Sequence, residues 1–171
     1  MKRALPYKFR WVILSEMKSK FVLFAALISL SVSVEADPKL KPIFTGKDLS
    51  GWAVPKGNDK AGWYSAEKGV LKIKNGPNKK GSILWTKKKF RNFVMEFDFR
   101  FGEGTVDSGV HVRNQDQIQI GISGSLKRDM TCSPYIPGKG YPVEAKNIKK
   151  LLKPKDWNMM KIQAVGKQYT V

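Results

Sequence analysis

The amino-acid sequence predicts an all-β protein in which short antiparallel strands form a sandwich, and three observations carry this prediction. In residues 93–101, large apolar side chains occupy every second position between smaller or charged ones. Successive side chains of a strand point to opposite faces, so this segment is a strand with an apolar face and a polar face. Residues 110–113 and 117–120 alternate in the same way. Strands of about five residues also recur between turn signals at intervals of roughly 8–12 residues, which is typical of an antiparallel sandwich.

Length and composition are those of a single globular domain. The chain has 171 residues, of which 42% are hydrophobic, and this suffices for one sizeable core. The formal charge of +18 favours anionic partners in general. The lysines are scattered, and no basic helix, zinc-finger spacing or RNA-binding strand motif accompanies them. We therefore expect a solvated basic surface and no nucleic-acid partner, with a polyanion-binding or adhesion protein as a weaker alternative.

The first 36 residues are predicted to be a signal-peptide region. Residues 17–20 are basic, residues 21–34 are apolar, and cleavage is expected after Ala36. The apolar stretch is shorter than the roughly 20 residues that a membrane span needs. We expect the true start at Met17 and the folded domain at residues 37–171. The protein is then exported to the periplasm or the cell exterior, without a stable membrane anchor after cleavage. An uncleaved N-terminal anchor is the alternative.

Prolines and glycines argue against helix in residues 37–62, which are expected to form a first strand and loops. Within them, Phe44, Leu49 and Trp52 are the predicted anchors into the core. A hairpin is predicted from residues 63–64 and 70–73 around a turn at residues 67–69. Residues 82–86 form a further short strand.

A turn at residues 102–104 separates the long strand from the two alternating segments that follow it. The polar residues of all three segments are expected to lie on one face, where we look for function. The long loop at residues 121–140 is rich in Gly, Ser and Pro, and loops of this length are usually binding loops or lids. A short helical turn is predicted within residues 145–152, a strand at 157–164, a turn at 166–168 and a final strand from Tyr169.

Three segments resemble a known family when they are taken together. They are residues 43–52 (IFTGKDLSGW), residues 92–101 (NFVMEFDFRF) with 107–113 (DSGVHVR), and residues 156–158 (DWN) followed by Gly166. In this order, behind a leader, they resemble the 3-keto-disaccharide hydrolase family. The resemblance covers about residues 40–171, and its first segment is the most specific.

The resemblance implies a concanavalin A-like (laminarin-G-like) jelly-roll sandwich that acts on carbohydrates. The substrates would be 3-keto-glycosides, cleaved by hydrolysis or by elimination. Family members continue beyond the position of Val171, so further strands are expected after the residues given. They also carry an E-x-Q-x-x-D strand, whereas this chain has Gln117, Gln119 and Ile122 at the three positions. An amide cannot take up a proton as a carboxylate does, so Gln117 cannot serve as a base.

Elimination from a 3-keto-glycoside needs a base at C2, stabilisation of the enolate oxygen at C3 and an acid at the leaving group. His111 titrates near neutrality, carboxylates accept protons, and guanidinium groups hold oxyanions. The predicted catalytic residues are Asp98, His111 and Arg113. The predicted substrate-binding residues are Glu96, Arg100, Gln117 and Gln119.

Structural roles compete with these functional ones. Asp98 and Arg100 are equally compatible with a cross-strand ion pair, and residues 107–109 with a turn that precedes a strand. The tryptophans are expected to pack in the core more often than to stack on sugars. The single cysteine, Cys132, excludes an intramolecular disulfide and a Cys-based zinc cluster, and we expect a passive thiol. No calcium-loop motif accompanies the carboxylates, so no metal or other cofactor is predicted. A non-catalytic carbohydrate-binding module is the alternative function, because the same fold supports it.

Overall fold

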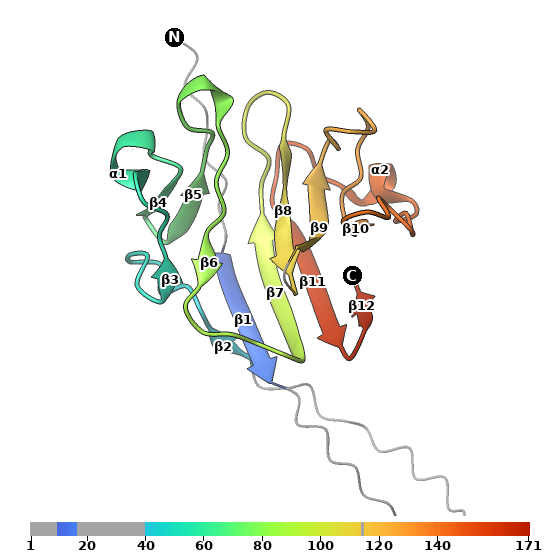
Figure 1. Ribbon diagram of the computed structural model, residues 1–171, viewed down its shortest axis with the longest axis horizontal. Coiled ribbons are helices and arrows are strands. Elements are labelled where there is room, and N and C mark those ends of the chain that lie inside the picture. Colours follow the sequence, from blue (N-terminus) through green and yellow to red (C-terminus); the bar gives the residue numbers. More distant parts are fainter. Residues whose placement is uncertain (1–9, 17–39, 114) are drawn as a thin grey trace, which may run out of the picture.

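The computed structural model describes residues 10–16, 40–113 and 115–171, and within them the protein is built almost entirely of antiparallel strands. Two sheets form the two layers of a sandwich (Figure 1). The first sheet has the order β12 (Gln168–Thr170), β11 (Asn158–Val165), β7 (Phe93–Phe99), β1 (Arg10–Glu16) and β2 (Lys41–Pro42). The second has the order β10 (Pro134–Tyr135), β9 (Asp116–Gly121) and β8 (Asp107–Val112).

Strand β7 lies at the centre of the first sheet and supplies much of the core. Its residues Phe93, Met95, Phe97 and Phe99 are buried, as the alternation of its sequence predicts. Strand β11 pairs antiparallel with β7 along its whole length, from Asn158 opposite Phe99 to Ala164 opposite Phe93. Burial of these aromatic side chains against the second layer is the main apolar contribution to stability.

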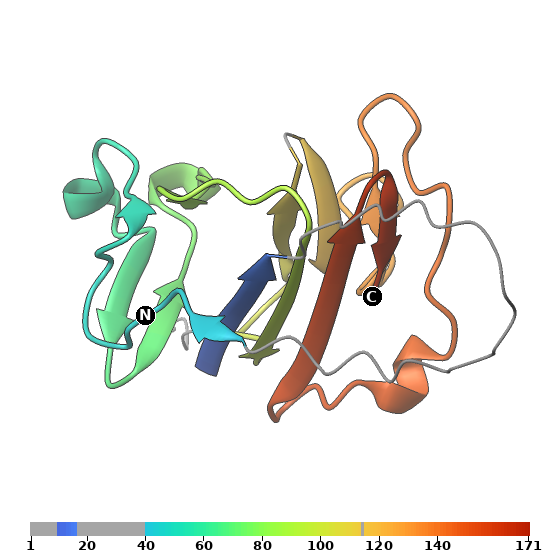
Figure 2. The same cartoon turned by 90° about the horizontal axis from the view of Figure 1, so that it is seen from below.

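The second sheet packs its apolar face on β7 and β11. Val112 of β8 and Ile118 and Ile120 of β9 belong to the same buried cluster as the β7 phenylalanines and Met160 and Ile162 of β11. The two layers are seen edge-on in Figure 2. This arrangement confirms the predicted all-β, antiparallel jelly-roll sandwich.

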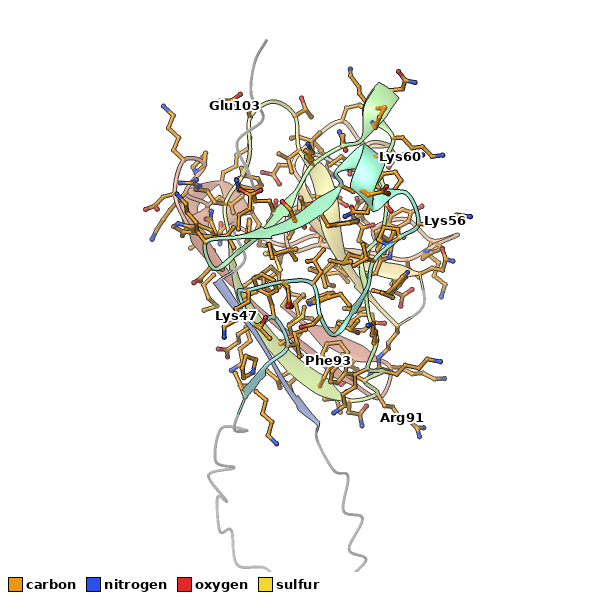
Figure 3. The ribbon with its side chains drawn as sticks, turned by 90° about the vertical axis from the view of Figure 1, so that its left-hand side faces the viewer. Lys47, Lys56, Lys60, Arg91, Phe93 and Glu103 are labelled. Atoms are coloured by element: carbon orange, nitrogen blue, oxygen red, sulfur yellow. The ribbon has the colours of Figure 1, made fainter. Side chains whose placement is uncertain are left out.

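A smaller lobe lies to one side of the sandwich. It contains β3 (Trp52–Ala53) paired with β6 (Trp85–Thr86), and β4 (Tyr64–Glu67) paired with β5 (Val70–Ile73). The β4–β5 hairpin confirms the predicted one. A single turn of helix, α1 (Asn58–Ala61), and a 3₁₀ turn, η1 (Pro77–Lys79), complete the lobe, and no helix was expected there. Helix α1 ends at Gly62, whose φ of +62° is the left-handed conformation that glycine adopts readily. Figure 3 shows Lys56 and Lys60 extending outward from this lobe, whereas Phe93 lies among the strands.

The long loop after β9 is tied to the sheet. The Gly121 N–H donates to Thr131 Oγ1 over 2.8 Å, and the Cys132 N–H donates to the Gln119 carbonyl over 2.9 Å. Thr131 is fully buried, and Asp129 accepts from its main-chain N–H. The loop therefore adds β10 as a third strand of the second sheet. Helix α2 (Ile148–Leu151) then confirms the predicted helical turn within residues 145–152.

Strand β1 lies in a region that the sequence places before the folded domain. It pairs antiparallel with β7 on one side and with β2 on the other. The sequence places residues 10–16 before the predicted domain, whereas their main chain pairs within the first sheet between β7 and β2. The predicted apolar stretch and the cleavage position after Ala36 lie outside the described residues. Among the described residues, the helices are too short to span a membrane.

Candidate functional site

The polar faces of the two sheets point in opposite directions. Each sheet turns its apolar face inward to the shared core, so the alternate side chains of β7 and those of β8 and β9 project from opposite outer faces. Glu96 and Asp98 lie on one outer face, and His111, Gln117 and Gln119 lie on the other. The expectation that these residues share one face is wrong, and the core of the sandwich separates the two groups.

The face that carries Glu96 and Asp98 is occupied by pairing within the first sheet. Lys161 of β11 lies directly opposite Glu96 and forms a 3.0 Å ion pair with it. Met159 lies opposite Asp98 and is 67% exposed. Arg100, just beyond the end of β7, places its guanidinium carbon 5.4 Å from the centre of the Trp157 ring. The described interaction of Arg100 is therefore a cation–π contact with Trp157, where a cross-strand ion pair was one alternative.

Arg113 holds main-chain segments together. Its guanidinium donates to the carbonyl of Gly166 between β11 and β12, and over 3.0 Å to the carbonyl of Arg91 before β7. It also lies 5.7 Å above the ring of Tyr169. Its φ of +46° places it at the turn that ends β8. The guanidinium is thus engaged in joining β8 to the first sheet.

The outer face of β8 and β9 contains a continuous hydrogen-bonded chain of side chains. Gln119, only 2% exposed, donates from Nε2 to Asp107 Oδ1 over 2.9 Å and to the Ile122 carbonyl over 3.3 Å. Gln117 donates from Nε2 to Gln119 Oε1 over 3.0 Å and to the Ser108 carbonyl over 3.1 Å. Gln119 is therefore a buried connector that fixes the orientation of both Gln117 and Asp107.

Asp107 is the carboxylate that this face presents to solvent. Its side chain is exposed, and only one of its two oxygens, Oδ1, receives the Gln119 amide. A methyl group added at Gly124 would lie 2.6 Å from the other oxygen, Oδ2, so the glycine leaves room beside that oxygen. An exposed carboxylate held by a buried amide is suited to accept a proton from a bound ligand.

His111 lies on the same face, at the other end of β8. It is half-buried, and burial lowers the pKa of its imidazole below 6.5, against the opposing effect of a hydrogen bond with the main chain of Gln115. The imidazole is therefore mainly neutral at pH 7. Its Nδ1 is enclosed and makes no hydrogen bond within the described part of the chain. His111 is directly opposite Gln117, so the two side chains are neighbours.

Aromatic side chains flank this face on both sides. Trp85 of β6 lies with its ring centre 5.6 Å from that of His111 and is 43% exposed. Tyr135 of β10 is directly opposite Gln117, which puts it on the same face, and its ring meets that of Tyr141 edge-on at 5.3 Å. Strands β6 and β10 lie on either side of β8 and β9 (Figure 1).

Three residues of this face lie in other surroundings than the sequence predicts. Asp107 was expected in a turn, but it begins β8 and points toward Gln119. Trp85 was expected in the core, yet nearly half of it is exposed. Tyr135 lay in a loop without a predicted strand. The alternation of β8 contained the signal for Asp107, because Asp107, Gly109 and His111 occupy every second position.

The remaining candidates for special chemistry are few. Burial raises the pKa of the Cys132 thiol to about 11, so the thiol is protonated and unreactive at neutral pH, as expected of a passive cysteine. Within residues 10–16, 40–113 and 115–171, no three His, Cys, Asp or Glu side chains gather as metal ligands would. The chemistry on this face therefore rests on Asp107, His111 and the two amides.

Two antiparallel sheets, with a hydrogen-bonded polar face flanked by Trp85 and Tyr135, define an antiparallel β-sandwich with one candidate binding face. The family of the 3-keto-alpha-glucoside-1,2-lyase-like domain matches residues 39–171, and the chain belongs to this family. This confirms the resemblance drawn from the three sequence segments. No curated protein and no solved structure matches the chain.

Proposed function

We propose that this domain cleaves 3-keto-glycosides at the outer face of β8 and β9, with Asp107 as the base. The observation that carries the proposal is the chain of hydrogen bonds that leads from Gln117 through buried Gln119 to the exposed Asp107 carboxylate. Family membership supports 3-keto-glycosides as the substrates of this proposal, and this face offers a positioned proton acceptor.

The proposed reaction is an elimination across C1–C2 of the oxidised sugar. The ketone at C3 acidifies the C2 hydrogen, and Asp107 Oδ2 takes that proton. The C1–O bond then breaks, its electron pair goes to the glycosidic oxygen, and a C1=C2 double bond forms in conjugation with the ketone. The protonated Asp107 returns the proton to the leaving oxygen. Addition of water across the double bond would complete a net hydrolysis.

Gln119 acts in this scheme as a positioning residue. It is buried and its amide is fully used, so it does not reach the substrate. By fixing Asp107 Oδ1, it leaves Oδ2 directed to the ligand, and a fixed base loses less orientational freedom in the transition state.

The alternative is a carbohydrate-binding module without turnover. The observation that favours it is the pair of glutamines on β9, where the family pattern described above has a glutamate before the glutamine. Amides donate to and accept from sugar hydroxyls but transfer no protons. Under this alternative the polar face would bind the same sugars unchanged.

A matched pair of Asp→Asn variants tests the proposal. Asp107→Asn keeps an oxygen that can accept from Gln119 but removes the base, so turnover of a 3-keto-glucoside should fall by about 100-fold or more. Asp98→Asn makes the same change on the opposite face and should keep wild-type turnover. The measurement is the rate at which the 3-keto-glucoside disappears and the free sugar forms.

Three outcomes separate the possibilities. Loss of turnover in Asp107→Asn alone supports the proposal, provided that thermal unfolding is unchanged. Loss in Asp98→Asn alone would place the site on the β7 face and refute it. A wild-type protein that binds the 3-keto-glucoside in calorimetry without converting it would establish the binding module instead.

A further inference from the structure

The small lobe carries a group of lysines that the proposed reaction does not use. Residues 54–64 and 74–83 contain five lysines and one acidic residue, Asp59, which gives these two segments a net charge of +4. All five lysine side chains are exposed, and we call them the lysine cluster: Lys56, Lys60, Lys74, Lys79 and Lys80.

Hydrogen bonds bring the segments of the lysine cluster together at one end of the lobe. The side-chain amide of Asn58 in α1 accepts from the Tyr64 N–H and donates to the Tyr64 carbonyl, both over 2.9 Å. The Trp63 carbonyl accepts from the Lys74 N–H over 2.9 Å, and the Trp63 indole N–H donates to the Lys80 carbonyl over 2.8 Å. Figures 2 and 3 accordingly show α1 and η1 side by side. The lysines therefore share one surface.

One lysine of the cluster occupies a backbone position that favours other residues. Asn78 and Lys79 have φ values of +54° and +59°, in the left-handed region that glycine and asparagine tolerate best. They are the central residues of a turn in which the Lys80 N–H donates to the Pro77 carbonyl over 3.1 Å. The chain thus carries a positive charge at the tip of this turn despite an unfavourable backbone conformation, which points to a use for the charge.

Two exposed aliphatic side chains accompany the lysine cluster. Val54 is 43% exposed and Ile83 is 42% exposed. Strands β3 and β6 pair antiparallel, so Val54, just after β3, and Ile83, before β6, lie toward the same end of this pair. Val54 is two residues before Lys56, and Ile83 is three residues after Lys80. The end of the lobe therefore combines positive charge with apolar surface.

We propose that this end of the small lobe docks reversibly on lipid bilayers that contain anionic lipids. Lysines close to such a bilayer are attracted to its negative surface potential, and aliphatic side chains beside them can enter the headgroup layer. The lysines project from turns and a short helix, and a projecting end suits a flat bilayer better than a polymer chain, which proteins usually hold in a groove. The inference is independent of the proposed function, because docking needs none of the residues of the β8–β9 face.

Co-sedimentation of the full chain with vesicles tests this inference. We would compare vesicles of phosphatidylcholine alone with vesicles that contain about one-third phosphatidylglycerol, at about 0.1 M and about 0.5 M NaCl. Wild-type protein should bind the anionic vesicles more tightly, and the difference should shrink at the higher salt concentration. The double variant Lys79→Gln/Lys80→Gln removes two charges and should reduce the ratio of the two affinities roughly 25-fold, about fivefold for each lysine. Ile83→Ser should weaken binding to the anionic vesicles roughly three- to ninefold.

A matched control removes the same charge from the opposite side of the molecule. Lys149 and Lys150 are adjacent exposed lysines of α2, which lies far from the small lobe (Figure 1). The double variant Lys149→Gln/Lys150→Gln should change the ratio less than about twofold, because these side chains lie beyond the Debye length from a bilayer docked at the lobe. All variants keep the apolar residues 21–34, so any contribution of that segment to binding cancels in the comparison.

Three outcomes would overturn the inference. Equal affinity of wild-type protein for both kinds of vesicle would show that anionic lipids are not recognised. An equal loss in the two double variants, each with unchanged thermal unfolding, would show that the net charge of the whole protein attracts the bilayer, with no surface on the lobe. Salt-sensitive binding to duplex DNA or heparin without binding to the anionic vesicles would assign the lysine cluster to a polymer instead.

Discussion

Replacing Arg113 with alanine should destabilise the domain, although the sequence alone predicts a catalytic role for this residue. The guanidinium donates to the carbonyls of Gly166 and Arg91, and both carbonyls lose a charged donor in the variant. A hydrogen bond to a charged group contributes about 1.5–3 kcal/mol when buried. Arg113 is half-exposed, so solvent replaces part of each contact, and we expect a total loss of about 2–3 kcal/mol.

The assay is thermal and urea unfolding followed by circular dichroism. For a domain of this size, the expected loss lowers Tm by roughly 4–12 °C. Arg91→Ala is a matched control, because Arg91 contributes its main-chain carbonyl to the contact while its own side chain is exposed. Truncation of an exposed side chain usually changes stability by less than about 0.5 kcal/mol.

The reasoning would be refuted by an Arg113→Ala variant that unfolds at the same temperature and urea concentration as Arg91→Ala. If that variant also lost turnover, a direct catalytic role for the guanidinium would be established in its place. Arg113→Lys keeps the charge but cannot bridge two carbonyls in the same plane, so its stability should fall between the two alanine variants.

Three further outcomes are expected. The pKa of His111, followed by NMR, should lie below 6.5. Because the pKa is lower in the folded state, the stability that His111 contributes is fully present above pH 6.5 and is lost as the pH falls through the folded-state pKa. An imidazole that titrates above pH 6.5 would contradict the burial of His111. Gly109→Ala should cost about 1–3 kcal/mol in urea unfolding and reduce turnover, because the added methyl group meets the main chain of β9 and the Gln117 side chain. Unchanged stability would show that β9 leaves room for a methyl group at this position. Cys132, with a pKa of about 11, should react with a maleimide at pH 7 far more slowly than a free thiol, and rapid labelling of folded protein would exclude this environment.

The local patterns of the sequence predicted the elements well. The alternation in β7 identified the four residues of its core face, since a side-chain period of two fixes that face once it is apolar, although Val94 on the other face is buried as well. The β4–β5 hairpin followed from two short apolar runs around a Lys–Gly turn. The resemblance to a family supplied the jelly roll and the expectation of a carbohydrate-active domain, which local patterns do not contain.

The arrangement of the polar residues was not predictable in the same way. Alternation tells which side of a strand is polar, but not which sheet the strand joins. Because β7 and β8 belong to different layers, their apolar faces meet and their polar faces diverge, which separates Asp98 from His111. The position of Trp85 beside the β8–β9 face was not predicted, because a large aromatic side chain usually packs in the core. Only the tertiary structure shows that it lies at the edge of this face.

Strand β1 has a consequence for any form of the chain that lacks it. A chain that lacks residues 10–16, through cleavage or through initiation at Met17, leaves the main-chain N–H and C=O groups along one side of β7 without their present partners. It also detaches β2, which pairs only with β1 among the described strands. An open edge of this kind recruits a strand from another chain. Loss of residues 10–16 would then lead to self-association, and size-exclusion chromatography of the chain with and without these residues would show whether a dimer forms.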